Sequence, residues 1–223
     1  MRDVLRAMEM RDVVLVHGLF HQPAHMDALV EALQQRGARV VVPRLHRGSL
    51  EADVRAVQAA ADLCETPPIL AGHSYGGAVI ADVTRACSYV FFAAFAPVAG
   101  ESCAELGGPD ALVNKWVRPH VSGGTYVPVQ FARELFYADC SPADASRAID
   151  LLVPQAGGHG RGVVRRAEWT RGPSHYIVCE DDRAVSPELQ QAMARRCDSS
   201  QRIHASHSPY ISQPDLIAEA IIG

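Results

Sequence analysis

The segment GHSYGG, residues 72–77, contains the residue types that most clearly fit catalysis. It holds the pattern Gly-x-Ser-x-Gly around Ser74, directly after an apolar run and directly before a helix-like stretch. A serine hydroxyl is a poor nucleophile, so it must stand exposed on a tight turn where a base can reach it. Gly72 and Gly76 leave space for such a turn. The pattern predicts a nucleophile at Ser74, and a glycine-rich turn without chemistry is the alternative.

A second turn, Val16 to Gly18, ends the first apolar run of the chain. The carboxyl ends of parallel strands meet at one edge of a sheet, where ligands bind, so we expect this turn to lie beside Ser74. The backbone amides of Leu19 and Tyr75 would then form an oxyanion hole, because the amides at a helix start face a developing negative charge. The alternative is a plain turn at the end of a strand.

An acid and a histidine must complete such a site, and both should follow the serine in the chain. The acidic run 180–182 comes directly after the apolar run 175–179, and His207 comes just after the run 201–205. Most of a charged run lies at the surface, so only one of the three acids belongs in the site, and spacing alone does not choose it. His204 competes with His207, but it falls inside the expected strand.

Strand-like and helix-like patterns alternate along most of the chain, which predicts a mainly parallel sheet flanked by helices. Short apolar runs indicate strands at 13–17, 38–43, 67–72, 88–94, 175–179 and 201–205. Amphipathic spacing indicates helices at 23–37, 50–61, 75–84, 141–152, 186–197 and from Ser212 to the end. Ser212 and Asp215 resemble a weak capping box at the start of the last helix.

The alternation stops between about residues 100 and 172, where glycines, prolines and aromatic residues are mixed. We therefore expect a core of residues 1–100 and 173–223, with residues 101–172 inserted as a cap after the strand that ends near Ala94. Long insertions in compact domains are usually functional and often cover a site.

Composition narrows the class of protein. The chain has 223 residues, a net charge of -4, and 48% hydrophobic residues, so it fits one soluble domain with no basic surface for nucleic acid or an anionic membrane. Its first twelve residues lack the apolar segment of a signal peptide, and its longest apolar run is too short to span a bilayer. We expect a cytoplasmic protein. Six scattered cysteines without a Cys-x-x-Cys pair predict neither a disulfide framework nor a metal site.

Several segments taken together resemble one known family. VVLVHG, GHSYGGAVI, FFAAFAP, FYADCSP, YIVCEDDRAVSPELQ and ASHSPYISQP occur in this order. They are similar to α/β-hydrolases related to plant methyl-salicylate and methyl-jasmonate esterases and hydroxynitrile lyases, in particular to small bacterial members. The resemblance runs from about residue 13 to 222 and is weakest in the insertion. It implies the α/β-hydrolase fold, no cofactor, a small ester-like substrate between cap and sheet, and a possible homodimer.

The resemblance also assigns roles to single residues. It implies Ser74 as nucleophile, His207 as base, Asp182 as acid, and the amides of Leu19 and Tyr75 as the oxyanion hole. The family usually has Thr-Glu before its acid where this chain has Glu180-Asp181, so a slip by one residue onto Asp181 stays open.

The residue types at two positions distinguish the hydroxynitrile lyases of this family from its esterases. The lyases carry a threonine after the first-strand histidine and a lysine just after the catalytic histidine, where a compact cation accepts developing cyanide charge. This chain has Gly18 and Ser208 there, and its only lysine is Lys115, within the insertion. The resemblance therefore favours an esterase.

We consider three functions. The first is a carboxylic-ester hydrolase that works through an acyl-enzyme. The second is another reaction on the same site: lactone or thioester hydrolysis, or a lyase- or cyclase-type step in small-molecule biosynthesis. The third is a ligand sensor without turnover, since fold does not fix function.

The substrate pocket is expected around the nucleophile and under the insertion. Candidate substrate contacts are Gly18, Phe20, His73, Trp116, Tyr126 and Phe136. The insertion's aromatic residues fit a pocket wall and a packed cap equally well; they are Trp116, Tyr126, Phe131, Phe136, Tyr137 and Trp169. No metal, nucleic acid or membrane partner is expected.

Overall fold

A six-stranded parallel sheet forms the centre of the protein. The structure is a computed structural model that describes residues 10–45 and 48–223. The expectation about a signal peptide falls mainly on residues 1–9, outside the described residues. The strands are β1 (Asp12–Val16), β2 (Arg39–Val41), β3 (Ile69–His73), β4 (Ser88–Phe92), β7 (Ser174–Cys179) and β8 (Ser199–Ile203). Their order in the sheet is β2-β1-β3-β4-β7-β8. The predicted α/β class, with strands at the six apolar runs, is confirmed.

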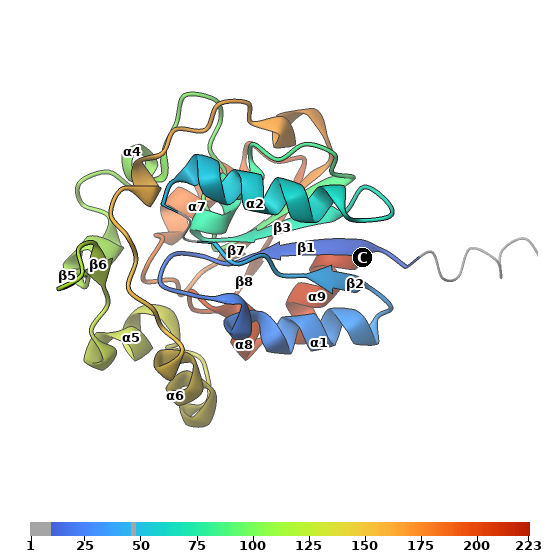
Figure 1. Ribbon diagram of the computed structural model, residues 1–223. Helices are drawn as coiled ribbons and strands as arrows, with labels where there is room; N and C mark the ends of the chain where they lie inside the picture. Colours follow the sequence, from blue (N-terminus) through green and yellow to red (C-terminus); the bar gives the residue numbers. More distant parts are fainter. Residues whose placement is uncertain (1–9, 46–47) are drawn as a thin grey trace, which may run out of the picture.

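Helices cover both faces of the sheet (Figure 1). One face carries α1 (Asp27–Gln35) and α9 (Pro214–Ile222), and the opposite face carries α2 (Leu50–Asp62), α3 (Tyr75–Ile80) and α7 (Pro187–Ala194). Each turns an apolar stripe toward strands whose residues are buried on both sides, as parallel sheets require. Within residues 10–45 and 48–223, no helix is long and apolar enough to cross a membrane.

Several element ends differ from the prediction, and two of these elements adjoin the candidate site. Strand β8 runs two residues earlier than expected, so His204 follows it instead of lying within it. This edge strand is mostly exposed and polar, and its position is fixed by pairing with β7, which an apolar pattern cannot reveal. The helix after Ser74 ends at Ile80 and not at Thr84. Asp82 instead accepts hydrogen bonds from the backbone of residues 165–167.

The end of the chain is also divided differently. A short helix α8 (Pro209–Ser212) comes before α9. At the other end of the chain, a 3-10 turn η1 (Pro23–Met26) comes before α1. Ser212 is therefore the last residue of α8, and Gln213 is the N-cap of α9. The capping box predicted from Ser212 and Asp215 is wrong, because Pro209 starts a helix before the expected boundary.

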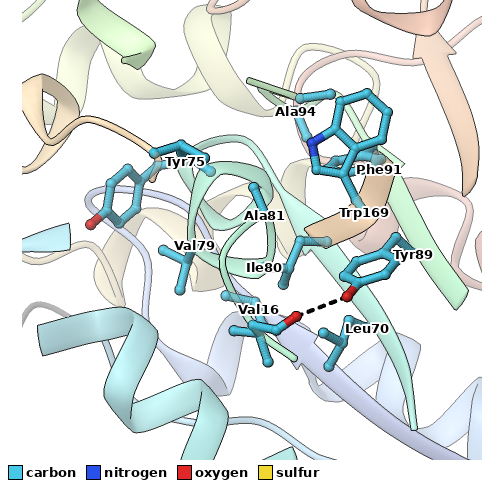
Figure 2. Packing of buried hydrophobic residues seen from close by; sticks show 14 of the residues in the cluster. Val16, Leu70, Tyr75, Val79, Ile80, Ala81, Tyr89, Phe91, Ala94 and Trp169 are labelled. Carbon is cyan, nitrogen blue, oxygen red and sulfur yellow. Dashed lines mark hydrogen bonds between the residues drawn. The ribbon is translucent and has the colours of Figure 1, made fainter. Parts of the chain in front are cut away.

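The segment between β4 and β7 contains short elements that lie mainly at one end of the sheet (Figure 1). They are α4 (Cys103–Gly107), η2 (Leu112–Lys115), β5 (Arg118–Pro119), β6 (Thr125–Tyr126), α5 (Val129–Phe136), α6 (Pro142–Asp150), η3 (His159–Arg161) and η4 (Glu168–Arg171). The final part returns to the sheet, where the Trp169 ring packs edge-on against Phe91 at 5.4 Å (Figure 2). The Trp169 Nε1–H donates a hydrogen bond to the Pro97 carbonyl. Trp169 thus belongs to the core of the sheet and not to a pocket wall.

Candidate active site

The topology of the sheet places the candidate residues at one edge. The chain leaves β1 toward β2 on one side, and β3 continues toward β4 on the other, so the strand order reverses between β1 and β3. The carboxyl ends of these two neighbouring strands carry Gly18 and Ser74. Such a reversal point leaves a crevice where ligands bind in open parallel sheets.

Ser74 lies on a sharp turn between β3 and α3. Its backbone is in an unusual conformation, with φ 53° and ψ -123°, which a non-glycine residue adopts only where its surroundings impose it. Glycines on the α3 side of the turn are needed because neighbouring backbone segments lie so close that a side chain would collide with them. A Cβ on Gly76 would lie 2.3 Å from the Val16 carbonyl oxygen, and one on Gly77 would lie 2.1 Å from the Phe95 carbonyl oxygen. The turn exposes the serine at the start of a helix.

His207 and Asp182 form a buried pair. The distance between His207 Nδ1 and Asp182 Oδ2 is 2.8 Å, and both residues are almost fully buried. The backbone amides of Ala184 and Val185 donate to Asp182 Oδ1, and the Gln190 side chain donates to Oδ2. These donors fix the carboxylate in place, and its Oδ2 accepts a hydrogen bond from His207 Nδ1–H.

The competing residues lie at the surface. The Asp181 side chain is 60% exposed, and that of His204 is 83% exposed. Glu180 pairs with Arg202 and lies 3.4 Å from His204. The geometry thus brings Asp182 alone of the three consecutive acids to His207.

A cavity of about 900 Å³ contains both Ser74 and His207 in its wall. Leu19 and Tyr75, whose amides the sequence analysis predicted to form an oxyanion hole, also line it. Phe20 and Phe136 also line it, and the Phe136 ring lies 5.6 Å from the His207 ring. Most other lining residues come from three stretches of the chain, 103–114, 155–161 and 184–189.

Four of the expected substrate contacts are placed elsewhere. Gly18 lies directly against Ser74, where a Cβ would come within 2.8 Å of the serine Cβ, so its contribution is space. His73 is fully buried, and its Nε2 donates to the His207 backbone carbonyl at 2.7 Å.

The two other misplaced residues belong to the insertion. Trp116 packs against Phe131, with 4.9 Å between their ring centroids. The Tyr126 and His120 ring centroids are 5.7 Å apart. Neither is part of the cavity wall within the described ranges. Their aromatic character reflects packing of the insertion, which was one of the two readings that the sequence left open.

The sequence did not indicate a buried histidine cluster beneath the site. His21 lies 5.7 Å from His73 and 4.6 Å from His25, and its Nε2 lies 2.9 Å from the Tyr137 hydroxyl. Burial lowers the pKa of His21 and of His73 well below the ordinary value. Both rings therefore stay uncharged near neutral pH, and the His73 ring lies 4.6 Å from the His207 ring.

Gln190 was also missed as a site residue, although the segment SPELQ around it carries part of the family resemblance. It is fully buried, donates to Asp182 and Val185, and accepts from the Cys179 amide. Among residues 10–45 and 48–223, no group of histidine, cysteine and acidic side chains is arranged to hold a metal ion.

Comparisons with known proteins agree with this architecture. The model of the alpha/beta hydrolase family matches residues 13–220. The alpha/beta hydrolase nvfD of Aspergillus novofumigatus is 26% identical over 235 residues, covering 94% of each chain. The pyrethroid hydrolase of Sphingobium wenxiniae is 28% identical over 253 residues, covering 96% of this chain and 87% of that protein.

Solved structures show the same fold. A pyrethroid hydrolase from Sphingobium faniae superposes with a TM-score of 0.80 at 24% identity, covering 95% of this chain and 96% of that one. A methylesterase from Arabidopsis gives a TM-score of 0.79 at 18% identity, with 96% and 98% coverage. The expected sheet-and-helix fold of the family is thereby confirmed.

Proposed function

Since the chain belongs to the alpha/beta hydrolase family, we propose that it cleaves a small-molecule carboxylic ester through an acyl-enzyme. Ser74 is the nucleophile, His207 the general base and Asp182 the acid that orients it. The observation that carries the proposal is the buried 2.8 Å contact between His207 Nδ1 and Asp182 Oδ2 beside a cavity that both His207 and Ser74 line.

In the first half of the reaction, Ser74 Oγ attacks the ester carbonyl while His207 Nε2 takes its proton. The Asp182 carboxylate accepts the Nδ1 hydrogen bond and stabilises the imidazolium that forms. The carbonyl oxygen becomes an oxyanion, and the backbone amides of Leu19 and Tyr75 donate to it. The tetrahedral intermediate then collapses, the alcohol takes the proton from His207 and leaves, and an acyl-Ser74 ester remains.

In the second half, water replaces the alcohol. His207 takes a proton from the water, the hydroxide attacks the acyl carbonyl, and the same amides hold the second oxyanion. Collapse returns the proton to Ser74 Oγ and releases the carboxylic acid. The insertion elements α4, η2 and α5 serve as a cap that keeps the ester over Ser74, which is consistent with their residues in the cavity wall.

Two positions favour hydrolysis over a lyase step on the same site. A side chain at Gly18 would collide with Ser74, so the threonine of the lyases does not fit this backbone. Ser208, where the lyases have a lysine, is fully buried, and its hydroxyl donates to Tyr210. The names of the pyrethroid hydrolase and methylesterase relatives also support ester substrates.

Turnover of p-nitrophenyl esters by matched serine variants tests the proposal. Ser74→Ala should lower kcat by about 10⁴-fold or more, as is typical when a triad nucleophile is removed. Ser122→Ala, at an exposed loop position, should retain wild-type turnover. Circular dichroism checks that both variants are folded. Turnover by Ser74→Ala close to that of the wild type would contradict the proposal.

A further inference from the structure

Leu19, whose amide is proposed to face the oxyanion, lies between two backbone carbonyls that buried histidine rings hold. On one side, His17 Nδ1 lies 3.0 Å from the Gly18 carbonyl oxygen. The Leu45 backbone N–H donates to His17 Nε2 at 3.3 Å, so His17 carries its proton on Nδ1 and donates from there. On the other side, His21 Nδ1 lies 2.7 Å from the Leu19 carbonyl oxygen. Side chains thus fix the backbone before and after the Leu19 amide.

The first of these contacts bears on the direction of the Leu19 N–H. The Gly18 carbonyl and the Leu19 N–H belong to one peptide group, and no peptide bond among the described residues is cis. The two bonds therefore point in opposite directions, so the N–H points away from the His17 ring. This peptide group lies beside the nucleophile, because a Cβ on Gly18 would be 3.3 Å from Ser74 Oγ. Leu19 is itself part of the cavity wall.

The tautomer of His21 follows from its two partners. A carbonyl oxygen only accepts, so Nδ1 carries the proton and donates to the Leu19 carbonyl. Burial lowers the pKa of His21 well below the ordinary 6.5, so the ring is neutral and its Nε2 is an acceptor. The Tyr137 hydroxyl, 2.9 Å from Nε2, therefore donates to it. Hydrogen bonds thus run in one direction, from Tyr137 through the His21 ring to the Leu19 carbonyl.

Tyr137 is a fully buried residue of the insertion, directly after α5. The insertion contacts the same loop at two further points. The Val153 N–H donates to the Phe20 carbonyl at 2.9 Å, and the Gln22 side chain donates to the insertion backbone, at the Leu151 carbonyl, at 2.8 Å. Phe20 has a φ of 65°, which a non-glycine residue adopts only where its surroundings impose it. Contacts with the insertion therefore hold the loop after β1 in its unusual shape.

We propose that Tyr137 and His21 position the Leu19 amide for the oxyanion, so that the insertion completes the oxyanion hole in addition to covering the cavity. This inference rests on the proposed ester hydrolysis. Within the described ranges, neither ring is part of the cavity wall, so both are positioning residues that act through Leu19. An oxyanion donor works only at hydrogen-bond distance from the developing charge, so a small displacement of the loop weakens it.

Hydrolysis of p-nitrophenyl butyrate by variants of these two residues tests the inference. Tyr137→Phe removes only the hydroxyl and should lower kcat/KM by about tenfold, the scale of one buried hydrogen bond. His21→Leu should lower it by about 10²-fold, which approaches the loss of one oxyanion donor. His21→Asn should stay within about threefold of the wild type, because the Asn amide nitrogen takes the place of Nδ1 as the donor to Leu19.

Tyr89→Phe is the matched control, because Tyr89 is a buried tyrosine of β4 whose hydroxyl donates to the Val83 carbonyl, outside the cavity wall. It should keep the wild-type kcat/KM. A second substrate separates positioning from general damage to the fold. In p-nitrophenyl thionobutyrate, sulfur replaces the carbonyl oxygen and accepts hydrogen bonds weakly, so the oxyanion hole contributes less to its hydrolysis. Tyr137→Phe and His21→Leu should therefore lose less kcat/KM on the thiono ester than on the oxygen ester.

The outcomes separate this inference from the proposed function. Unchanged kcat/KM in Tyr137→Phe, equal losses on the two esters, or His21→Asn as slow as His21→Leu would each overturn the inference alone. Absence of turnover of the oxygen ester by the wild type would count against ester hydrolysis itself. Should His21→Leu not fold, Tyr137→Phe decides. Should the thiono ester react too slowly to measure, the comparison of His21→Asn with His21→Leu decides.

Discussion

At the scale of single residues, the orientation of the acid is the feature that the geometry resolves most sharply. Asp182 receives two backbone amides and the Gln190 side chain in addition to His207, so each of its oxygens has donors. The neighbouring Asp181 has a mainly exposed carboxylate. In the proposed mechanism, a carboxylate fixed in this way accepts from Nδ1–H and so selects the imidazole tautomer whose Nε2 acts as the base.

Exchange of carboxylates for amides tests this difference. Asp182→Asn should lower kcat by about 10²- to 10⁴-fold, because the amide favours the wrong tautomer of His207 while keeping its shape. Asp181→Asn should change kcat little, because its side chain faces solvent. Steady-state kinetics of both variants on one ester provide the measurement. A larger loss of kcat in Asp181→Asn than in Asp182→Asn would mean that Asp181 is the acid and that our assignment in the loop after β7 is wrong by one residue.

The sequence predicted which residues meet at this edge of the sheet better than it predicted their surroundings. Ser74 and His207 were identifiable because a motif and a strand end fix where they must lie. His73 was expected to contact substrate, yet it is buried beneath the site, since a position beside a nucleophile points inward or outward according to the strand register. His159 carries no local motif, and only the folded insertion brings its ring to the Tyr75 ring.

At the scale of elements, the turn between β3 and α3 depends on close contact between backbones. Gly77 brings α3 against the Phe95 carbonyl so closely that no side chain fits. The strands were predictable because buried parallel strands are nearly continuous apolar runs. Within the insertion, the helix expected at 141–152 is found as α6. Most of its other short helices and turns were not predictable, because they are held by contacts with distant residues, such as those of Asp82 with the backbone of 165–167.

A glycine-to-alanine pair measures this close contact. Gly77→Ala should lower the free energy of unfolding by about 2 to 3 kcal/mol, because the new methyl group must displace backbone. Gly160→Ala should have little effect, since nothing lies within 4 Å of its Cβ position. Urea unfolding of both variants gives the two values. Equal stability of Gly77→Ala and the wild type would show that α3 does not pack as described.

At the scale of the whole molecule, the buried histidines link stability to pH. His21 and His73 have pKa values well below the ordinary 6.5 because burial disfavours their charged forms. In the unfolded chain they bind protons near that ordinary value. Below about pH 6.5 the unfolded state therefore takes up more protons than the folded state, and stability falls as the pH is lowered.

Urea unfolding at about pH 7 and about pH 5.5 measures this slope, to which each such histidine adds up to about 1.4 kcal/mol per pH unit. His21→Gln should reduce the slope, because glutamine does not titrate. His204→Gln, at an exposed position, should leave it unchanged. If His21→Gln and the wild type lose stability equally on acidification, the buried ring is not held uncharged.

The central claim is that Ser74 is an activated nucleophile in an intact site, and covalent labelling tests it without knowledge of the substrate. A fluorophosphonate reacts with a serine only when a base and an oxyanion hole activate it. Mass spectrometry of digested, labelled protein should find one modified peptide, carrying the adduct on Ser74, and the adduct should be absent from His207→Ala and from heat-denatured wild type. Native protein that stays unlabelled, or a label on another serine, would contradict the account.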